Sequence, residues 1–278
     1  MIKSNGTLFF LFLVVYQFLF SWLLFVVRDY IPAAIFHSPF FIILLMAFMF
    51  LVPLGIWLAM KNERLSTHMP KAKLGCANIF LVLGISFFML PFMMLIASIT
   101  TIFTPNVAAN FMEQTQAHSI WVMLLAIAVT PAVVEEVVFR GFIQAQYPGW
   151  PFWRVAVMNG LLFGLIHMNF SQFFYAFFMG IAFAYMVHIT RSLWAAIISH
   201  FFMNGFNVVM FRALSWMDDN FGGTMESYET VEIAPLDAVI AMGILALGAL
   251  PFVIALWYVF VRYNRRRFAI QIHKETCV

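Results

Sequence analysis

The chain has 278 residues, of which 64% are hydrophobic and only 10% are charged. About 25% of the residues of a typical soluble domain are charged, so this composition excludes a water-soluble globular protein and predicts a polytopic membrane protein. The formal charge of +3 does not indicate nucleic-acid binding, because the basic residues are spread among the segments between apolar runs, where membrane proteins use them for orientation.

The apolar runs predict an all-α bundle of about eight transmembrane helices. A helix needs about 20 apolar residues to span a bilayer. Five runs reach that length: Leu8–Val27, Pro39–Met60, Ala77–Thr100, Trp121–Phe139 and Leu236–Val261. Three shorter or interrupted runs complete the set: Val155–His167, Phe173–Ile189 and Leu193–Met210. Because no polar stretch is long enough for a soluble domain, we expect a single membrane domain over residues 1–278.

The basic residues predict the orientation of this bundle. With eight spans and both termini in the cytoplasm, 13 of the 15 Lys and Arg residues fall on the cytoplasmic side, and only Arg28 and Arg212 fall outside. The positive-inside rule therefore supports both the number of spans and the orientation. The connection from Arg212 to Pro235 contains five acidic residues and is interpreted as a solvated outer loop.

The fourth apolar run contains two adjacent acids and an arginine. Glu136 and Arg140 are four residues apart, so they share one face of a helix and can form an ion pair, whereas Glu135 points about 100° away. Ionised groups inside a bilayer are costly unless they are paired, so the sequence predicts one paired acid and one free acid. Pro131, about one turn earlier, can open the helix backbone.

Two further polar groups lie in the shorter runs. His167 ends the segment Phe163–His167, and His200 and Asn204 share a face of the seventh run. Each of these residues also has a purely structural interpretation, as a hydrogen-bonding contact between neighbouring helices. These spans contain few other polar residues, so we expect the acids, the histidines and the asparagine to meet at one place.

Such a group of residues can hydrolyse an amide. A carboxylate beside a histidine can take a proton from water and return it to a leaving amine, and His and Asn donors aimed at one point can stabilise an oxyanion. Glu135, His167 and His200 could instead bind zinc, since two histidines, a glutamate and a water form a known catalytic set. The sequence leaves both chemistries open.

Three ordered motifs resemble those of a known family. Glu-Glu-x-x-x-Arg at Glu135–Arg140, Phe-x-x-x-His at Phe163–His167 and His-x-x-x-Asn at His200–Asn204 are similar to the motifs of the CPBP family. This family contains the type II CAAX prenyl endopeptidases and bacteriocin-processing membrane proteins, also called Abi proteins. The resemblance covers roughly Trp121–Val209 and implies an intramembrane glutamic-type endopeptidase, with residues 121–210 as its catalytic core and residues 1–120 and 211–278 as accessory helices and loops.

The resemblance also implies a role for each motif residue. Glu135 would activate water with the assistance of His167, His200 and Asn204 would form the oxyanion site, and Glu136 and Arg140 would support the helix. It favours a mechanism without a metal cofactor, with zinc as the alternative. The implied substrate is a prenylated peptide, a leader peptide or a small membrane protein, and the implied location is a bacterial plasma membrane.

These roles place a condition on the fourth helix. His167 lies about 20 Å along the fifth span from Arg154, at 1.5 Å per residue. Glu135 reaches a similar depth only if its helix continues through Arg140 to about Gln146. Arg140 is then buried with Glu136 instead of lying in a loop, and the number of cytoplasmic basic residues falls to 12.

A function of a different class is also compatible with the sequence. A non-catalytic immunity or scaffolding protein could keep the same polar residues for packing, and a proton-coupled transporter could use a Glu–His cluster as a relay. Transporters often contain repeated halves, and this sequence shows no internal repeat.

Overall fold

The structure is a computed structural model, and it describes residues 5–36, 38–104, 112, 117–221 and 235–276. Over these residues the chain is all-helical, as predicted, with a single isolated bridge between Lys71 and Ser192 as its only β-type pairing. The elements in chain order are α1 (Gly6–Val27), η1 (Arg28–Tyr30), α2 (Ala33–Phe36), α3 (Pro39–Lys61), η2 (Leu65–Thr67), α4 (Cys76–Thr101), α6 (Ile120–Met123), η3 (Leu124–Val129), α7 (Thr130–Glu136), η4 (Val137–Phe142), η5 (Ile143–Gln146), α8 (Phe152–Leu165), α9 (Phe170–Thr190), α10 (Trp194–Phe221) and α11 (Pro235–Thr276).

The chain is a multi-pass membrane protein. Seven of the described helical segments are long and apolar enough to cross a membrane, and α8, with 14 residues, is a shorter apolar helix. These eight segments correspond to the eight predicted runs. Large apolar side chains lie exposed along α1 and α11 in particular, among them Phe18, Trp22, Leu247 and Ile254. Exposed apolar surfaces of this extent are unfavourable in water, and in a membrane they are covered by lipid.

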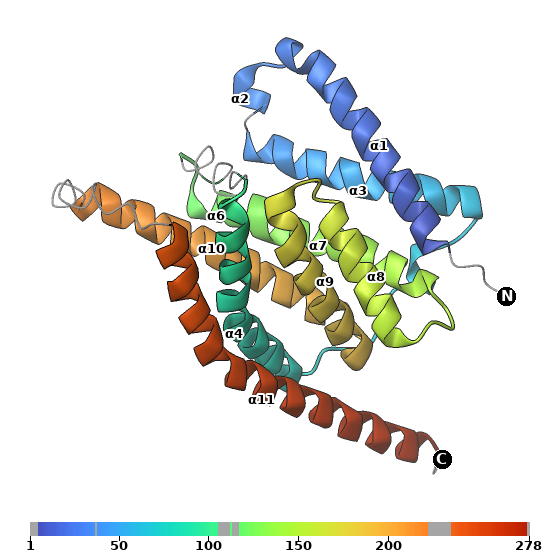
Figure 1. Cartoon of the computed structure of the whole chain (residues 1–278). Helices are drawn as coiled ribbons and strands as arrows, with labels where there is room; N and C mark the ends of the chain where they lie inside the picture. Colours follow the sequence, from blue (N-terminus) through green and yellow to red (C-terminus); the bar gives the residue numbers. More distant parts are fainter. Residues whose placement is uncertain (1–4, 37, 105–111, 113–116, 222–234, 277–278) are drawn as a thin grey trace.

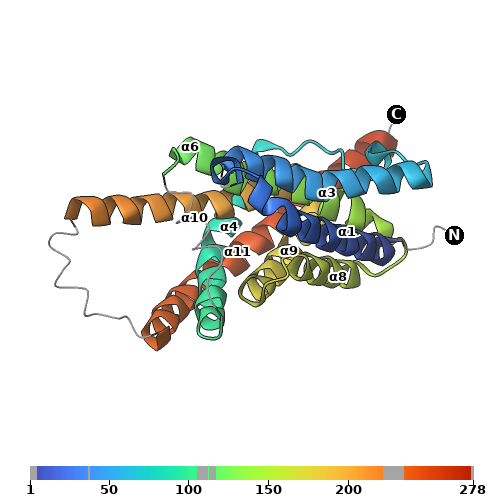
Figure 2. The ribbon, with the colours of Figure 1, turned by 90° about the horizontal axis from the view of Figure 1, so that it is seen from above.

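The helices form three packed pairs with α10 running across them. Helix α1 packs on α3, α8 packs closely on α9, and α4 packs along α11, as Figure 1 shows. Helix α10 contacts α4, α9 and the α6–α7 segment, so it connects the α4–α11 and α8–α9 pairs, whereas α3 contacts the α6–α7 segment. Figure 2 shows α10 extending well beyond the rest of the bundle. Because α10 continues to Phe221, the predicted end of this span near Met210 is wrong; residues 222–234 of the expected outer loop lie outside the described residues.

The fourth span is one continuous helical segment from Ile120 to Gln146, so the predicted extension past Arg140 is confirmed. It is not a uniform α-helix. Six-residue π-helical turns, η3 and η4, flank the short helix α7, which contains both acids. π-helical turns are rare and often lie at functional sites. They change the hydrogen bonding of backbone carbonyl groups, and two of these carbonyls have partners on other helices.

Two apolar clusters enclose this segment. One cluster joins α1, α3, η4 and α8, with Phe9, Trp57 and Phe142 among its buried members. The other joins α4, α9, α10 and α11, with Ile85, Phe183 and Phe260 among its buried members. The polar residues of the three motifs therefore lie inside the bundle, where every polar group needs a partner.

Candidate active site

Glu136 and Arg140 form the predicted ion pair in the interior of the bundle. Arg140 Nη1 donates to Glu136 Oε1 at 2.8 Å, and neither side chain has any exposed surface. Burying two charges costs more than a simple pair returns unless further hydrogen bonds satisfy them. Both residues have such additional contacts.

Arg140 is held by α8 and α9 as well as by Glu136. Its Nη2 donates to the backbone carbonyl of Gly180 at 3.2 Å, and its guanidinium carbon lies 4.3 Å from the centroid of the Phe163 ring and 5.3 Å from that of Phe183. Aromatic faces attract a desolvated cation. The guanidinium is therefore enclosed by a carboxylate, a carbonyl and two aromatic rings.

Glycines allow α9 to pack closely against α8. A Cβ atom placed on Gly180 would lie 2.6 Å from the Cα of Gly160, and one placed on Gly160 would lie 2.6 Å from the carbonyl oxygen of Phe177. Gly160 and Gly164 form a small-x-x-x-small motif, which lets two membrane helices pack backbone to backbone. This contact brings the Gly180 carbonyl within reach of Arg140.

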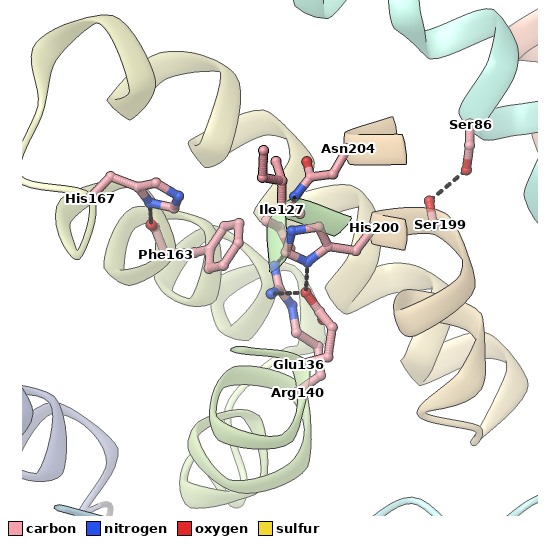
Figure 3. A network of polar contacts seen from close by, with 10 residues as sticks. Ser86, Ile127, Glu136, Arg140, Phe163, His167, Ser199, His200 and Asn204 are labelled. Atoms are coloured by element: carbon pink, nitrogen blue, oxygen red, sulfur yellow. Dashed lines mark hydrogen bonds and ion pairs between the residues drawn. The ribbon is translucent and has the colours of Figure 1, made fainter. Parts of the chain in front are cut away.

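His200 joins the pair from α10. Its Nδ1 lies 2.8 Å from the same oxygen of Glu136 that accepts from Arg140, and only 3% of the residue is exposed. Because a carboxylate accepts, Nδ1 carries the proton in this contact. Figure 3 shows Glu136 between Arg140 and His200, with Asn204 on the other side of the His200 ring. His200 therefore contacts Glu136, and Asn204, one turn later on the same face of α10, lies beside the His200 ring.

Asn204 bonds to the backbone of the fourth span. Its Nδ2 donates to the carbonyl of Ile127 at 3.1 Å. In a regular helix this carbonyl would accept from the residue four positions later, which is Pro131 and has no N–H. Asn204 satisfies the carbonyl in its place, so the predicted effect of Pro131 on the backbone takes the form of a contact between helices.

Asn159 makes the equivalent contact at the second π-helical turn, and sequence reasoning missed it. Its Nδ2 donates to the carbonyl of Phe139 in η4 at 2.9 Å, and the residue is fully buried. The available signal was its position as an amide in the middle of the apolar run Val155–His167. The two asparagines fasten α8 and α10 to the two π-helical turns on either side of the acids.

His167 lies near this group but is separated from it. Its Nδ1 donates to the carbonyl of Phe163, one turn earlier, at 2.7 Å. The Phe163 ring meets the His167 ring edge to face at 5.2 Å and the His200 ring at 5.9 Å. Figure 3 shows the Phe163 ring between the two histidines. With Nδ1 protonated, Nε2 of a neutral His167 is an acceptor.

Glu135 is the acid without a partner. Only 5% of the residue is exposed, and its Oε2 is buried with no hydrogen-bond partner in the part of the chain that the structure describes. The Glu135 carboxyl group lies close enough to His200 and Arg140 to interact with them electrostatically. Tyr175 of α9 is also close enough to interact with Glu135 in this way. Oε2 of Glu136 is likewise buried without a partner, so the acids differ at Oε1 of Glu136, which accepts from Arg140 and His200. A buried carboxylate oxygen without a donor is costly, and a water or substrate group that donates to it would be stabilised.

The described residues contain no preformed set of zinc ligands. Among the described residues, no three His, Cys, Asp or Glu side chains come close enough together to hold a metal ion. His200 directs Nδ1 at Glu136, and His167 directs Nδ1 at a backbone carbonyl. The side chains present therefore do not fit a zinc site in this arrangement, and we derive no reaction step through a metal.

Comparisons with known proteins agree with the motifs. Residues 117–206 match the family model described as Type II CAAX prenyl endopeptidase Rce1-like. A protein of Bacillus subtilis (strain 168), named "Putative membrane peptidase YdiL", is 28% identical over 104 residues, which cover 35% of this chain and 43% of that protein. No solved structure matches the chain. The family resemblance indicated by Glu135–Arg140, Phe163–His167 and His200–Asn204 is thereby confirmed.

Proposed function

We propose that this membrane protein, which carries a type II CAAX endopeptidase-like segment over residues 117–206, is an intramembrane endopeptidase that cleaves by glutamate-activated water. Its substrates would be prenylated peptides, leader peptides or small membrane proteins, and its location a bacterial plasma membrane. The observation that carries the proposal is the division between the two adjacent acids. Glu136 accepts from both Arg140 and His200 through Oε1, whereas no hydrogen bond joins Glu135 to another described residue; each acid keeps a buried Oε2 without a donor.

The proposed reaction starts from the form in which both acids are ionised and His200 carries two protons. The four side chains have no net charge in this form, as they also have none when Glu135 is protonated and His200 is neutral, so the proton can move between these two residues without changing the charge of the group. Glu136 accepts from both cations and holds them in place. Glu135 then remains as the carboxylate that can accept a proton from water.

In the proposed reaction, Glu135 moves one proton twice. Glu135 takes a proton from water, and the water oxygen attacks the carbonyl carbon of the scissile amide. The oxyanion accepts from Nε2–H of the doubly protonated His200 and from the second Nδ2 hydrogen of Asn204, whose first hydrogen is used on Ile127. The oxyanion then re-forms the carbonyl group, the C–N bond breaks, and Glu135 returns the proton to the nitrogen of the leaving amine. Because Nδ1 of His167 donates to the Phe163 carbonyl, its Nε2 is available as an acceptor, and in this proposal it orients the water from the opposite side of the Phe163 ring to His200.

The test is a comparison of Glu135→Gln with the wild type. The substitution keeps the shape and removes the base, so we expect no cleavage of a membrane peptide by a protein that inserts and unfolds like the wild type. His167→Ala is expected to lose cleavage in the same way. Cleavage at the wild-type rate by both variants would refute the proposal and favour the non-catalytic scaffold. Peptide accumulation in the host membrane gives the corresponding measurement in cells.

Treatment with a chelator distinguishes the glutamate mechanism from a zinc-dependent mechanism. A glutamate-activated water predicts that purified wild-type enzyme cleaves at the same rate after prolonged treatment with EDTA or 1,10-phenanthroline. Loss of cleavage that added zinc restores would instead establish the metal mechanism.

A further inference from the structure

A groove with an apolar lining lies between α4, α9 and α11, and the proposed reaction does not use it. It has a volume of about 550 Å³, and ligand pockets typically have volumes of about 300–1,000 Å³. All eleven residues that line it have an apolar or aromatic side chain, among them Met89, Met93, Ala182, Tyr185 and Trp257. The groove is therefore suited to an apolar ligand.

The groove runs along the helices and is open to the membrane. Its lining extends from Phe178 to Tyr185 on α9 and from Leu250 to Trp257 on α11. Seven residues of a helix rise by about 10 Å, which fits within one leaflet of a bilayer whose hydrocarbon core is about 30 Å thick. Phe178 is 47% exposed and Leu250 is 41% exposed, so a molecule in the surrounding lipid can reach the groove. Its direction and length are those of a stretch of acyl chain in a single leaflet.

Two prolines account for the gap between the helices. Pro91 of α4 is next to Phe92, Pro251 of α11 is next to Leu250, and Phe92 and Leu250 both line the groove. A proline inside a helix removes a backbone hydrogen bond and bends the helix. Figure 1 shows the bend midway along α11. Helices that bend at this level do not pack as a straight pair, and the groove lies where they bend.

Exposed cations lie beyond one end of the groove. Tyr185 and Trp257 mark that end, and tyrosine and tryptophan are enriched at the boundary between hydrocarbon and headgroups. Arg191 follows Tyr185 by six residues and Arg265 follows Trp257 by eight, which correspond to rises of about 9 and 12 Å. Both arginines are exposed and lie on the side predicted to be cytoplasmic. They are thus placed at the level of the lipid headgroups.

These arginines have no acidic partner in the described ranges. None of the ion pairs between described residues involves Arg191 or Arg265. Arg267 adds a third cation at this end, where its Nη2 donates to the carbonyl of Lys73 at 3.4 Å. Anionic lipids of the cytoplasmic leaflet attract basic residues near the membrane surface. The charge at this end of the groove therefore complements an anionic headgroup.

The lining fits a lipid chain better than a helix of a second protein. Helix–helix interfaces in membranes are rich in small residues, which let the backbones approach closely. Ala182 is the one small residue among those that line the groove. Met89 and Met93 have flexible side chains that adapt to a ligand of irregular shape. An acyl chain is such a ligand.

From these observations we propose that the groove binds one acyl chain of an anionic phospholipid, with the phosphate group at Arg191 and Arg265. A lipid in this position contacts α4, α9 and α11 together, so it stabilises the attachment of α11 to the bundle. The site stands apart from the proposed peptidase activity, because no residue of the three motifs lines the groove.

Quenching of Trp257 fluorescence tests this binding in the full-length protein. The protein is reconstituted in phosphatidylcholine vesicles with increasing fractions of phosphatidylglycerol or phosphatidylcholine whose acyl chains are brominated, because bromine quenches tryptophan. Subtracting the signal of Trp257→Phe leaves the signal of Trp257. We expect half-maximal quenching at a fraction of brominated phosphatidylglycerol roughly tenfold to thirtyfold below that of brominated phosphatidylcholine, as two cations near a membrane surface predict.

Substitution of the two arginines tests the headgroup contact. Arg191→Gln/Arg265→Gln should remove the preference for phosphatidylglycerol. Arg64→Gln/Arg154→Gln is the matched control, because it removes two other exposed cations of the same predicted side, and it should keep the preference. Equal quenching by the two lipids in the wild type, or an unchanged preference in Arg191→Gln/Arg265→Gln, would overturn the proposal.

Native mass spectrometry counts the bound lipid. Ala182→Phe fills the groove, whereas Gly248→Phe is its control, because Gly248 lies about 160° around α11 from Leu250 and a Cβ there meets nothing within 4 Å. One phosphatidylglycerol molecule should remain on the wild type and on Gly248→Phe, and none on Ala182→Phe. Added phosphatidylglycerol should raise the melting temperature of the first two proteins only.

Two results of this measurement would also overturn the proposal. Retention of the lipid by a folded Ala182→Phe variant would place the lipid outside the groove. A dimer without bound lipid that Ala182→Phe dissociates would assign the groove to a second copy of the chain. If Ala182→Phe does not fold, the quenching measured with the arginine variants decides the question by itself.

Discussion

Replacing Arg140 by methionine tests whether the ion pair holds the fold or only accompanies the chemistry. The guanidinium has no exposed surface and contacts Glu136 at 2.8 Å and the Gly180 carbonyl at 3.2 Å. Methionine fills much of the same space among the aromatic rings and removes the charge. The main consequence is that Glu136 loses its permanent cationic partner while it stays buried.

The expected cost is large for a single substitution. Removing one partner of a buried ion pair destabilises a protein by about 3–5 kcal/mol. For a chain of this size, such a loss lowers the melting temperature by roughly 6–20 °C. Glu136→Gln should cost a similar amount because it leaves Arg140 without an anion. The double variant Glu136→Gln/Arg140→Met leaves neither charge unpaired, so it should be more stable than the sum of the single losses by about 1–3 kcal/mol.

Thermal unfolding of the purified variants in one detergent, followed by intrinsic tryptophan fluorescence, measures these differences. Glu135→Gln is the matched control, since it neutralises the adjacent acid without breaking a hydrogen bond of the described structure. We expect its melting temperature to stay within a few degrees of the wild type. Single-variant losses below about 1 kcal/mol, or strict additivity in the double variant, would refute the structural role of the pair.

Two further predictions concern helix packing. Gly180→Ala places a Cβ 2.6 Å from the Cα of Gly160, so α8 and α9 must separate and the melting temperature should fall. Gly55→Ala is the control, because a Cβ there meets nothing within 4 Å and should raise the free energy of unfolding by about 0.5–1 kcal/mol. Equal melting temperatures of the two variants would contradict the close contact of α8 and α9. Asn78 and Asn264 exchange two side-chain hydrogen bonds, at 3.0 and 2.8 Å, between α4 and α11, so Asn78→Ala should cost about 1–3 kcal/mol in thermal unfolding. Unchanged stability would show that the pair does not hold α11.

Much of the architecture and the paired acid could be predicted from the sequence. The apolar runs are long, and a membrane leaves a buried backbone few options besides helix, so the helical segments follow from composition. The Glu136–Arg140 pair follows from i,i+4 geometry within one helix. The extension to Gln146 followed from a requirement on depth, because an acid can meet a histidine only when both lie at the same level of the bundle.

The contacts between helices could not be predicted in the same way. Nothing in the local spacing indicates that His200 would bond to Glu136 instead of Glu135, since that choice depends on how α10 is rotated against α7. The π-helical turns and the role of Asn159 are also absent from any periodic pattern. They arise because backbone carbonyls of one helix meet amide side chains of another, and this depends on three-dimensional packing.

This packing also determines which substitution can change cleavage without disturbing the structure. Asn204 supports the backbone at Ile127, His200 helps to neutralise Glu136, and Arg140 holds α9, so a change at any of them disturbs structure and chemistry together. Glu135 forms no bond through its buried oxygen to the described part of the chain. A buried carboxylate oxygen without a donor, which Glu136 also has, is costly, and an ordered water or a catalytic role is among the reasons that proteins keep one. A loss of cleavage in Glu135→Gln at unchanged stability would therefore report on the reaction itself.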